Sequence, residues 1–369
     1  MSFEDEVYQW GDELARHFLG LSKPQRENIA RFGLAVIKAR DCRMSIVAEQ
    51  VPELGKVDSA ERQLQRTVSN QHIEMGRCQR EWARWVLSLL AGQQYVLVDE
   101  TKLGANLSVM MVGVAYRRRC VPLVWRSYQV GAYPAEGQVG MIEQLLQVVA
   151  EVLPIGAEPP VVEVDRGLGT SPDLVRVVAE LGWHYLFRVQ NTTRVCLPTT
   201  GESPIGNLVT AGQRLSAFGQ VFKGDGFVVE AWLHVLWDKR YDQPWSLITN
   251  DPTLSGDEYA VRAWQETSFR DLKSGGWKWN NSHIWLPEHA DRLLLILALA
   301  YSFMLSLGTL VLDAPPAVRK RLARGSRSRL GIFRLGLRLI KFAWRSCFSC
   351  PLALDFVQPP PLLFSPPFL

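Results

Sequence analysis

The order of apolar segments between residues 95 and 190 constrains the fold more than any other feature of this chain. Three strand-like runs come first, followed by a helix, a strand, a second helix and a last strand. These segments are 95–99, 108–116, 120–125, 137–153, 160–165, 172–181 and 184–190. Strands joined by short turns form an antiparallel meander, whereas strands reached through a helix lie parallel to a neighbour. The sequence therefore predicts an α/β domain with a mixed sheet.

This order of elements is that of a ribonuclease H-like core of the retroviral-integrase type, which we expect over residues 89–313. Residues 191–244 interrupt the order with turn-rich polar segments and with an alternating run at 226–237. They predict a β-rich insertion, after which the strand-like segment 245–251 returns to the body. The chain has 369 residues, which is enough for two or three domains and at least one large core.

Residues 1–88 form a predicted helical region before the core. Ser45 and Ser59 are candidate N-caps of two short helices that are separated by a tight turn. Two such helices resemble a helix-turn-helix, in which Arg62 and Arg66 would contact DNA. A plain helical bundle explains the same pattern equally well.

Residues 314–369 form a predicted basic C-terminal tail. Residues 314–354 contain ten Lys or Arg side chains and no acidic one, although the net charge of the whole chain is only +4. Such a block favours a polyanionic partner and binding that weakens as salt rises. A solvated basic helix is the alternative, and the proline-rich segment 358–369 predicts an extended or disordered end.

Several features favour a cytoplasmic protein. Residues 293–312 contain no charge and could span a membrane, but serines, a glycine and a threonine interrupt them, so we expect a buried core helix. The chain starts with an acidic, polar segment rather than a signal sequence. Its six cysteines are scattered rather than arranged as a disulfide framework. Cys347 and Cys350 form one CxxC motif without the further ligands that structural zinc needs.

A polar constellation lies within the segment 258–276. Tyr259, Arg262, Glu266 and Lys273 have the spacing Y-x2-R-x3-E-x6-K. At about 100° per residue, an α-helix would place all four side chains on one narrow face. A face with a carboxylate, two cations and a phenol is unlike an apolar core stripe or a mixed solvated surface. It suits a site where a metal ion and a phosphate meet.

Two further acids complete a candidate catalytic set. Asp99 ends the first strand and Asp165 ends the fourth, so in neighbouring strands their carboxylates would lie side by side and raise each other's pKa. With Glu266, they could hold two divalent cations for in-line phosphoryl transfer. Ligands that are all oxygen favour Mg²⁺ or Mn²⁺ over zinc. Each acid alone is more readily explained as a turn, cap or surface residue, and only the combination favours catalysis.

These motifs resemble those of bacterial insertion-sequence DDE transposases of the YREK class, known as insertion sequence family four. The matching segments are VLVDET, VVEVDRGLGTSPDL, HYLFRVQ, SLITND and YAVRAWQETSFRDLKSGGW. The resemblance implies that Asp99, Asp165 and Glu266 are catalytic residues that bind two Mg²⁺ or Mn²⁺ ions. It implies that Tyr259, Arg262 and Lys273 contact DNA phosphates at the transposon end, and we add Arg270 to these DNA-binding candidates.

The resemblance also implies cut-and-paste transposition. Water attacks to free a 3′-hydroxyl at each transposon end, and that hydroxyl then attacks target DNA. Some family members pass through a DNA hairpin, with a tryptophan of the insertion stacked on a flipped base. Trp237 is the first candidate for that role, followed by Trp232 and Trp245, because an aromatic face can replace lost base stacking. These tryptophans equally well explain packing within the insertion.

The expected partners are the terminal inverted repeats and the target DNA, bound by a homodimer that brings two ends together. We expect no membrane partner and no nucleotide cofactor, because the chain lacks a phosphate-binding loop. Two other functions fit: a metal-dependent nuclease of the same fold, and a transposase-derived DNA-binding protein that no longer cleaves. The cations of the YREK segment favour the transposase over the nuclease, since they would hold a cut end for joining. The intact acids argue against the inactive protein.

Overall fold

The computed structural model describes residues 2–51, 54–90, 92, 94–223, 227–317, 320, 330–346 and 353–356. The α-helices are α1 (Phe3–His17), α2 (Lys23–Ala39), α3 (Met44–Ala48), α4 (Val57–Ser69), α5 (Met75–Ser88), α6 (Gly137–Val152), α7 (Arg166–Gly169), α8 (Pro172–Glu180), α9 (Ala263–Leu272), α10 (Pro287–Asp313) and α12 (Ile332–Arg345). The 3-10 helices are η2 (Ile205–Leu208), η3 (Asp257–Arg262) and η4 (Trp279–Asn281). The strands are β1 (Tyr95–Leu103), β2 (Leu107–Tyr116), β3 (Arg119–Gln129), β4 (Val161–Val164), β5 (His184–Arg188), β6 (Arg194–Leu197), β7 (Gly201–Pro204), β8 (Arg214–Val221), β9 (Val229–Leu236) and β10 (Trp245–Thr249).

The described strands form one ten-stranded sheet in the order β3-β2-β1-β4-β5-β10-β9-β8-β6-β7. Strands β1, β2 and β3 form an antiparallel meander, whereas β4 lies parallel to both β1 and β5. The α/β class, the meander and the parallel crossovers are therefore confirmed. In the register of β1 and β4, Val98 pairs with Val164. Asp99 and Asp165 are the next residues of the two segments, so they lie at the same level of the sheet. Asp165 directly follows β4, as predicted, but the prediction that Asp99 ends the first strand is wrong, because β1 continues past it to Leu103.

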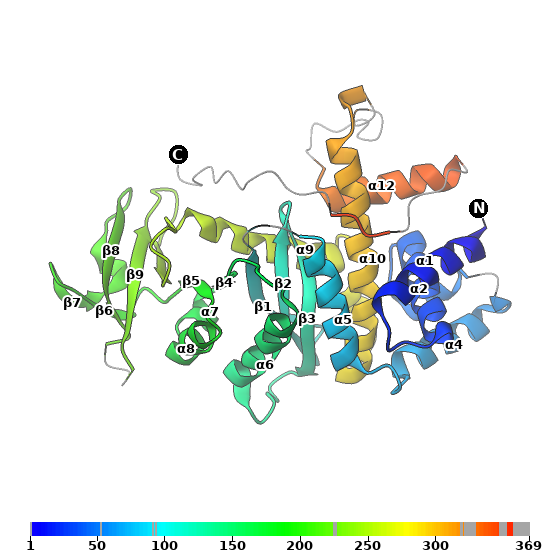
Figure 1. Cartoon of the computed structure of the whole chain (residues 1–369), viewed down its shortest axis with the longest axis horizontal. Helices are drawn as coiled ribbons and strands as arrows, with labels where there is room; N and C mark the ends of the chain where they lie inside the picture. Colours follow the sequence, from blue (N-terminus) through cyan, green and yellow to red (C-terminus); the bar gives the residue numbers. More distant parts are fainter. Residues whose placement is uncertain are drawn as a thin grey trace.

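The segment 191–244 contains strands β6 to β9, as predicted, and these strands continue the central sheet. Strand β9 pairs with β10, and β10 pairs with β5, in both cases antiparallel. Backbone hydrogen bonds therefore connect the insertion to the body without interruption. Figure 1 shows β8, β9, β6 and β7 at the end of the molecule that lies opposite the N-terminal helices.

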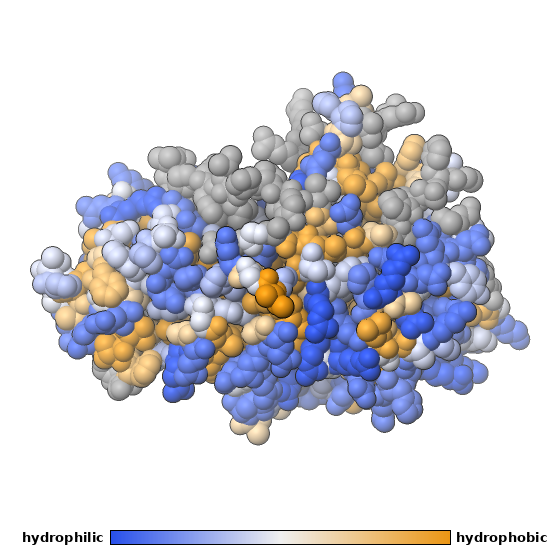
Figure 2. Space-filling view, viewed as in Figure 1, coloured by the Kyte–Doolittle hydropathy of each residue, from blue (hydrophilic) through white to orange (hydrophobic). Residues whose placement is uncertain are grey.

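Helix α10 is the central helix of the described structure and lies between the sheet and the N-terminal helices (Figure 1). It is long and apolar enough to cross a membrane, but 94% of its most apolar window is buried inside the protein. It contacts α2, α4, β3 and α12. The prediction of a buried core helix is therefore confirmed. The outer surface over α5 and α6 is, by contrast, mostly hydrophilic (Figure 2).

The predicted N-caps Ser45 and Ser59 are wrong by two and three residues respectively. Helix α3 has Arg43 at its N-cap position, where the Asp41 carboxylate accepts a hydrogen bond from the Arg43 backbone N–H at 3.0 Å. Helix α4 has Lys56 as its N-cap, and its carbonyl accepts from the Ser59 backbone N–H. Backbone bonds and a neighbouring carboxylate thus set these helix starts, and neither serine side chain does.

Part of the predicted basic tail is a packed helix. Helix α12 lies against α10 and buries one apolar face. Its aromatic anchor Phe333 contacts Trp277 and Tyr301, with ring centroids 5.2 and 5.3 Å apart respectively. The CxxC motif of Cys347 and Cys350 and the proline-rich segment 358–369 lie outside the described residues.

Asp291 on α10 makes the stability of the fold depend on pH. Its carboxylate accepts a hydrogen bond from the Ser127 backbone N–H at 2.9 Å, and burial raises its pKa from 3.8 to about 7. Because the folded state binds this proton more tightly, the stabilisation is complete below the unfolded pKa and is lost as pH rises through about 7. We expect Asp291→Asn to remove this part of the pH dependence of the free energy of unfolding. Urea denaturation from about pH 4 to about pH 8 measures it, and an unchanged profile would contradict the assignment.

Candidate active site

Asp165 sits where β4 ends and the short helix α7 begins. Its Oδ1 atom accepts hydrogen bonds from the backbone N–H groups of Gly167 and Leu168, at 2.9 and 3.1 Å. The carboxylate is therefore the N-cap of α7, and its rotamer is fixed by backbone donors. Within the described part of the chain, its second oxygen accepts no hydrogen bond and remains able to bind a ligand.

Asp99 lies beside it on β1, in a drier environment. Its side chain is 16% exposed, and its Oδ2 atom lies 2.7 Å from the Arg262 guanidinium. Burial raises the pKa of Asp99 to about 6, with Arg262 opposing the rise and Asp165 adding to it. Burial is the larger cause of the raised pKa of Asp99, Asp165 adds to it, and Arg262 supplies the nearest compensating charge.

The segment with the YREK spacing is not one α-helix, which corrects the predicted shared face. Residues 257–262 form the 3-10 helix η3, α9 begins at Ala263, and Lys273 is the C-cap of α9. Gly256 adopts a φ of 89° before η3, and Glu258 folds back to accept a hydrogen bond from the Ser255 backbone N–H at 3.0 Å. This tight start replaces the 100° steps of an α-helix with the larger steps of a 3-10 helix.

Three of the four YREK side chains nevertheless bind strands β1 and β4, namely those of Tyr259, Arg262 and Lys273. The Tyr259 hydroxyl donates to the Val164 carbonyl at 3.1 Å, and Lys273 Nζ donates to Thr101 Oγ1 at 2.6 Å. Tyr259 is 4% exposed and Arg262 is 5% exposed. Burial lowers the pKa of Lys273, and Asp99 opposes that change. In this state of the protein these groups bind the acid-bearing strands rather than form an exposed row.

An open cavity of about 350 Å³ collects the remaining site residues. Its lining comprises Asp165, Arg166, Arg188, Trp245, Tyr259, Ala260, Arg262, Ala263 and Glu266. Glu266 is exposed, in the first turn of α9. The cavity thus brings Glu266 to the same space as Asp165, while Asp99 is joined to it through Arg262. Among the described residues, however, no three Asp, Glu, His or Cys side chains are close enough together to hold a metal ion.

The donor chemistry of the site fits a hard divalent cation. The available ligands are carboxylates, which Mg²⁺ and Mn²⁺ prefer. Arg262 now supplies the positive charge next to Asp99 that a cation would supply. Its Nε and Nη1 atoms are buried without a hydrogen-bond partner in the described structure, so the guanidinium is only partly satisfied by Asp99. The three carboxylates that would hold the ions are Asp99, Asp165 and Glu266.

A fourth carboxylate, which sequence reasoning missed, lies beneath the site. Glu163 is fully buried on β4, and neither of its carboxyl oxygens has a side-chain or backbone partner in the described structure. Burial raises its pKa well above the ordinary value, and Arg262 is the charge that opposes this rise. A glutamate in the otherwise apolar run VVEV of a central strand was the available signal.

Two cations of the cavity were also missed. Arg188 ends β5, and its pKa is lowered by burial and by the neighbouring Arg166. Arg166 directly follows Asp165 and donates to Gln243 Oε1 at 3.3 Å. Both face the cavity, so this side of the site is positively charged. Their positions at strand ends next to the acids were the signal in the sequence.

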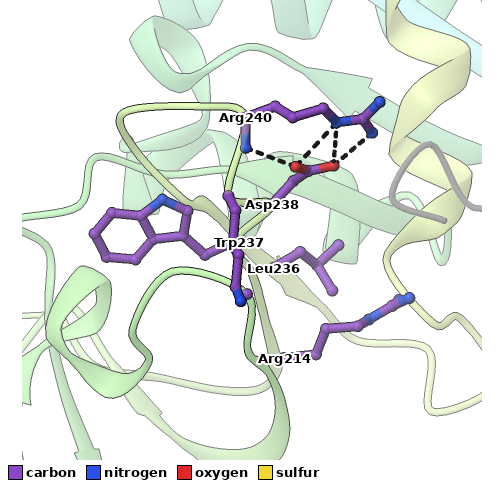
Figure 3. Close-up of a pocket in the computed structure, with 7 residues that line it drawn as sticks. Arg214, Leu236, Trp237, Asp238 and Arg240 are labelled. Carbon is purple, nitrogen blue, oxygen red and sulfur yellow. Dashed lines mark hydrogen bonds and ion pairs between the residues drawn. The ribbon is translucent and has the colours of Figure 1, made fainter.

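The three candidate tryptophans lie in different places. Trp245 lines the cavity that contains Asp165 and contacts Tyr259 edge-to-face, with ring centroids 5.2 Å apart. Trp237 lines another cavity, together with Arg214 and the ion-paired Asp238 and Arg240 (Figure 3). Trp232 packs against Phe218 on neighbouring strands. The order of candidates changes accordingly, because Trp245 is the one that shares a cavity with Asp165 and Glu266.

The other DNA-binding candidates are exposed. Arg270 lies on α9, one helical turn after Glu266. Arg62 and Arg66 lie on α4, which is separated from the sheet by α10 (Figure 1). None of these three arginines lines the cavity that contains Asp165 and Glu266, and their predicted contact with DNA stays a prediction.

Comparison of the chain with models of known protein families, and with curated proteins, gave no match.

Proposed function

We propose that this chain is a DNA transposase of the YREK class, with a ribonuclease H-like core and a metal-dependent phosphoryl-transfer site. One observation carries the proposal: Asp165 and Glu266 share a cavity with Arg262, which is bound to Asp99. The sheet order supports it, because an antiparallel β3-β2-β1 meander followed by parallel β4 and β5 is the arrangement that this fold requires. That arrangement brings the two aspartates to the same level of neighbouring strands.

A pair of Mg²⁺ or Mn²⁺ ions held by Asp99, Asp165 and Glu266 would activate the attacking oxygen and stabilise the leaving oxygen. The chain's own residues supply the remaining contributions. Arg166, Arg188 and Arg262 surround the cavity with positive charge that can pair with a DNA phosphate. Trp245 offers an aromatic face at the same cavity, which could stack on an unpaired base.

Tyr259 and Lys273 are expected to act through position. The Tyr259 hydroxyl bonds to the Val164 carbonyl and so holds η3 against β4, directly next to Asp165. Lys273 bonds to the Lys102 carbonyl at 2.7 Å and to Thr101, and so holds the end of α9 against β1. These contacts hold both ends of the segment that carries Glu266 against the strands that precede Asp165 and contain Asp99.

The proposal is tested with duplex DNA that carries the inverted repeats flanking the gene. We expect the full chain to nick this DNA at the end of the repeat in Mg²⁺ or Mn²⁺, and chelation with EDTA to stop cleavage until excess metal is restored. Electrophoresis of end-labelled strands measures both results. Cleavage that is unaffected by EDTA would contradict a two-metal site.

The same experiment separates the competing functions. Joining of the freed 3′-hydroxyl to a supercoiled plasmid distinguishes a transposase from a nuclease, which would cleave without joining. DNA binding without cleavage in either metal would identify an inactive, transposase-derived binding protein. Analytical ultracentrifugation with two repeat ends tests the proposed homodimer.

A further inference from the structure

Helix α12 carries a straight row of cations. Arg334, Arg338, Lys341 and Arg345 follow one another at offsets of 0, 4, 7 and 11 residues. At about 100° per residue they fall at roughly 0°, 40°, −20° and 20°, so they occupy one narrow stripe about 16 Å long. We call these four residues the basic ridge.

The opposite face of α12 fixes the basic ridge in place. Its buried residues are Ile332, Phe333, Leu335, Gly336, Leu337, Ile340 and Ala343. This face is packed on α10 and on Trp277, and it is therefore not available for insertion into a lipid bilayer. The cations stand on a rigid support, so they lose little conformational freedom of the backbone when they bind a partner.

The basic ridge faces solvent with little internal neutralisation. Arg334, Lys341 and Arg345 are exposed. Among the described residues, none of these three forms an ion pair with an acidic side chain. Ion pairs with acidic side chains are formed, by contrast, by Arg77, Arg117, Arg119 and Arg126. Positive charge that is neither buried nor paired within the molecule is available for an external anion.

Positive charge also continues from the basic ridge to the helix that carries Glu266. Asp271 on α9 is paired with Arg119 at 2.5 Å, and Arg334 and Arg270 both act electrostatically on the same carboxylate. Three cations therefore surround one acid at the junction of α9 and α12. Gly276, at the end of the α9 turn, lies directly against Phe333 of α12, which confirms that the two elements adjoin.

We propose that the basic ridge binds the sugar-phosphate backbone of the duplex DNA that extends beyond the cavity of Asp165 and Glu266. This inference rests on the proposed function, because it places the reacting DNA end at Glu266. Duplex DNA carries about one charge per 1.7 Å of axis, so about nine phosphates lie along a ridge of about 16 Å, and each exposed cation of the ridge can contact one of them. The contact is independent of base sequence, and it would hold the duplex while the cavity acts on its end.

The test compares two triple variants of the full chain. The ridge variant carries Arg334→Gln, Lys341→Gln and Arg345→Gln. The matched control carries Arg16→Gln, Lys23→Gln and Arg176→Gln, which removes three exposed positive charges from α1, α2 and α8. Fluorescence anisotropy gives the affinity of each protein for a long inverted-repeat duplex at several salt concentrations, and circular dichroism shows that each protein is folded.

We expect the slope of log affinity against log salt to become less steep by about 2.7 in the ridge variant, since each phosphate contact contributes about 0.9. At about 0.15 M salt this corresponds to an affinity loss on the order of tenfold to a hundredfold. The control should retain the wild-type slope. An unchanged slope in the ridge variant, or an equal loss in the control, overturns the inference.

Other results separate this inference from the proposed function. Ridge-dependent binding to vesicles that contain phosphatidylserine, with DNA binding unchanged, would assign the basic ridge to a lipid surface and overturn the inference. DNA binding that depends on the basic ridge, in a wild-type protein that never cleaves, would support the inference and defeat the proposed catalysis. A wild-type protein that binds no duplex would overturn both.

Discussion

Glu266→Gln is expected to abolish metal-dependent cleavage, by about a thousandfold or more, which corresponds to about 4 kcal/mol of lost transition-state stabilisation. The substitution removes the charge that would bind a metal ion but leaves the volume of the side chain almost unchanged. Glu266 is exposed and makes no hydrogen bond or ion pair within the described structure. Folding and DNA binding should therefore be preserved, and end-labelled cleavage assays in Mg²⁺ measure the loss.

The chain offers a closely matched control for this substitution. Glu288 is also an exposed glutamate in the first turn of a helix, α10, and it does not line the cavity. Glu288→Gln should cleave at the wild-type rate. Asp99→Asn is a less selective test, because it would leave the buried Arg262 without its carboxylate partner and would cost stability as well. Cleavage by Glu266→Gln at the wild-type rate would defeat the assignment of the site.

Gly336→Ala is expected to destabilise the protein by about 3 kcal/mol or more. A Cβ atom at this position would lie 1.9 Å from the Met304 carbonyl oxygen on α10. The reciprocal glycine Gly308 is equally tight, with the Ile332 carbonyl oxygen 1.8 Å from its Cβ position. Because both obstacles are backbone atoms, no rotamer change can relieve them, and α12 would have to separate from α10.

Gly76→Ala is the matched control for that prediction. Gly76 also lies in a helix, α5, but its nearest obstacle is the flexible end of Arg80 at 3.6 Å. Alanine there should stabilise the protein by up to about 1 kcal/mol, because glycine is a poor helix former. Urea denaturation measures both variants. A Gly336→Ala protein as stable as wild type would mean that α12 does not pack on α10 as described.

The topology of the sheet could be predicted from the sequence because it depends on connection lengths. Strand β4 is reached through α6, and β5 through α8, so parallel pairing was the expected result. The neighbouring positions of Asp99 and Asp165 followed from that pairing alone. Strand lengths were less predictable: β1 continues four residues past Asp99 to Leu103, because its antiparallel partner β2 begins at Leu107 and pairs with it to that point.

The local geometry of the YREK segment could not be predicted from spacing. The periodicity of an α-helix predicts one shared face for residues 259–273, but tertiary contacts of Tyr259 and the turn at Gly256 select a 3-10 helix for the first part of this segment. The partners of Arg262 and the buried state of Glu163 likewise depend on residues far away in the chain. Such pairings carry no signal in the local pattern, since the pattern shows residue types and not distances.

The apolar face of α12 shows the same limit. The sequence shows that residues 314–354 are basic, but a count of charges does not show which of these residues pack against the core. The docking of α12 depends on two glycines, Gly308 and Gly336, that lie on different helices and allow their backbones to meet. Only the three-dimensional arrangement shows that part of a basic tail belongs to the core.

The unbroken pairing from β5 through β10 to β9 has a mechanical consequence. An appended lobe on a flexible tether could swing open and closed around a substrate, whereas a hydrogen-bonded extension can only twist together with its neighbours. The wall that carries Trp232 and the start of β10 is thus stationary relative to Asp165. Under the proposed function, nucleic acid that enters from that side would have to adapt its own shape to the protein, and the DNA end would be distorted rather than the wall.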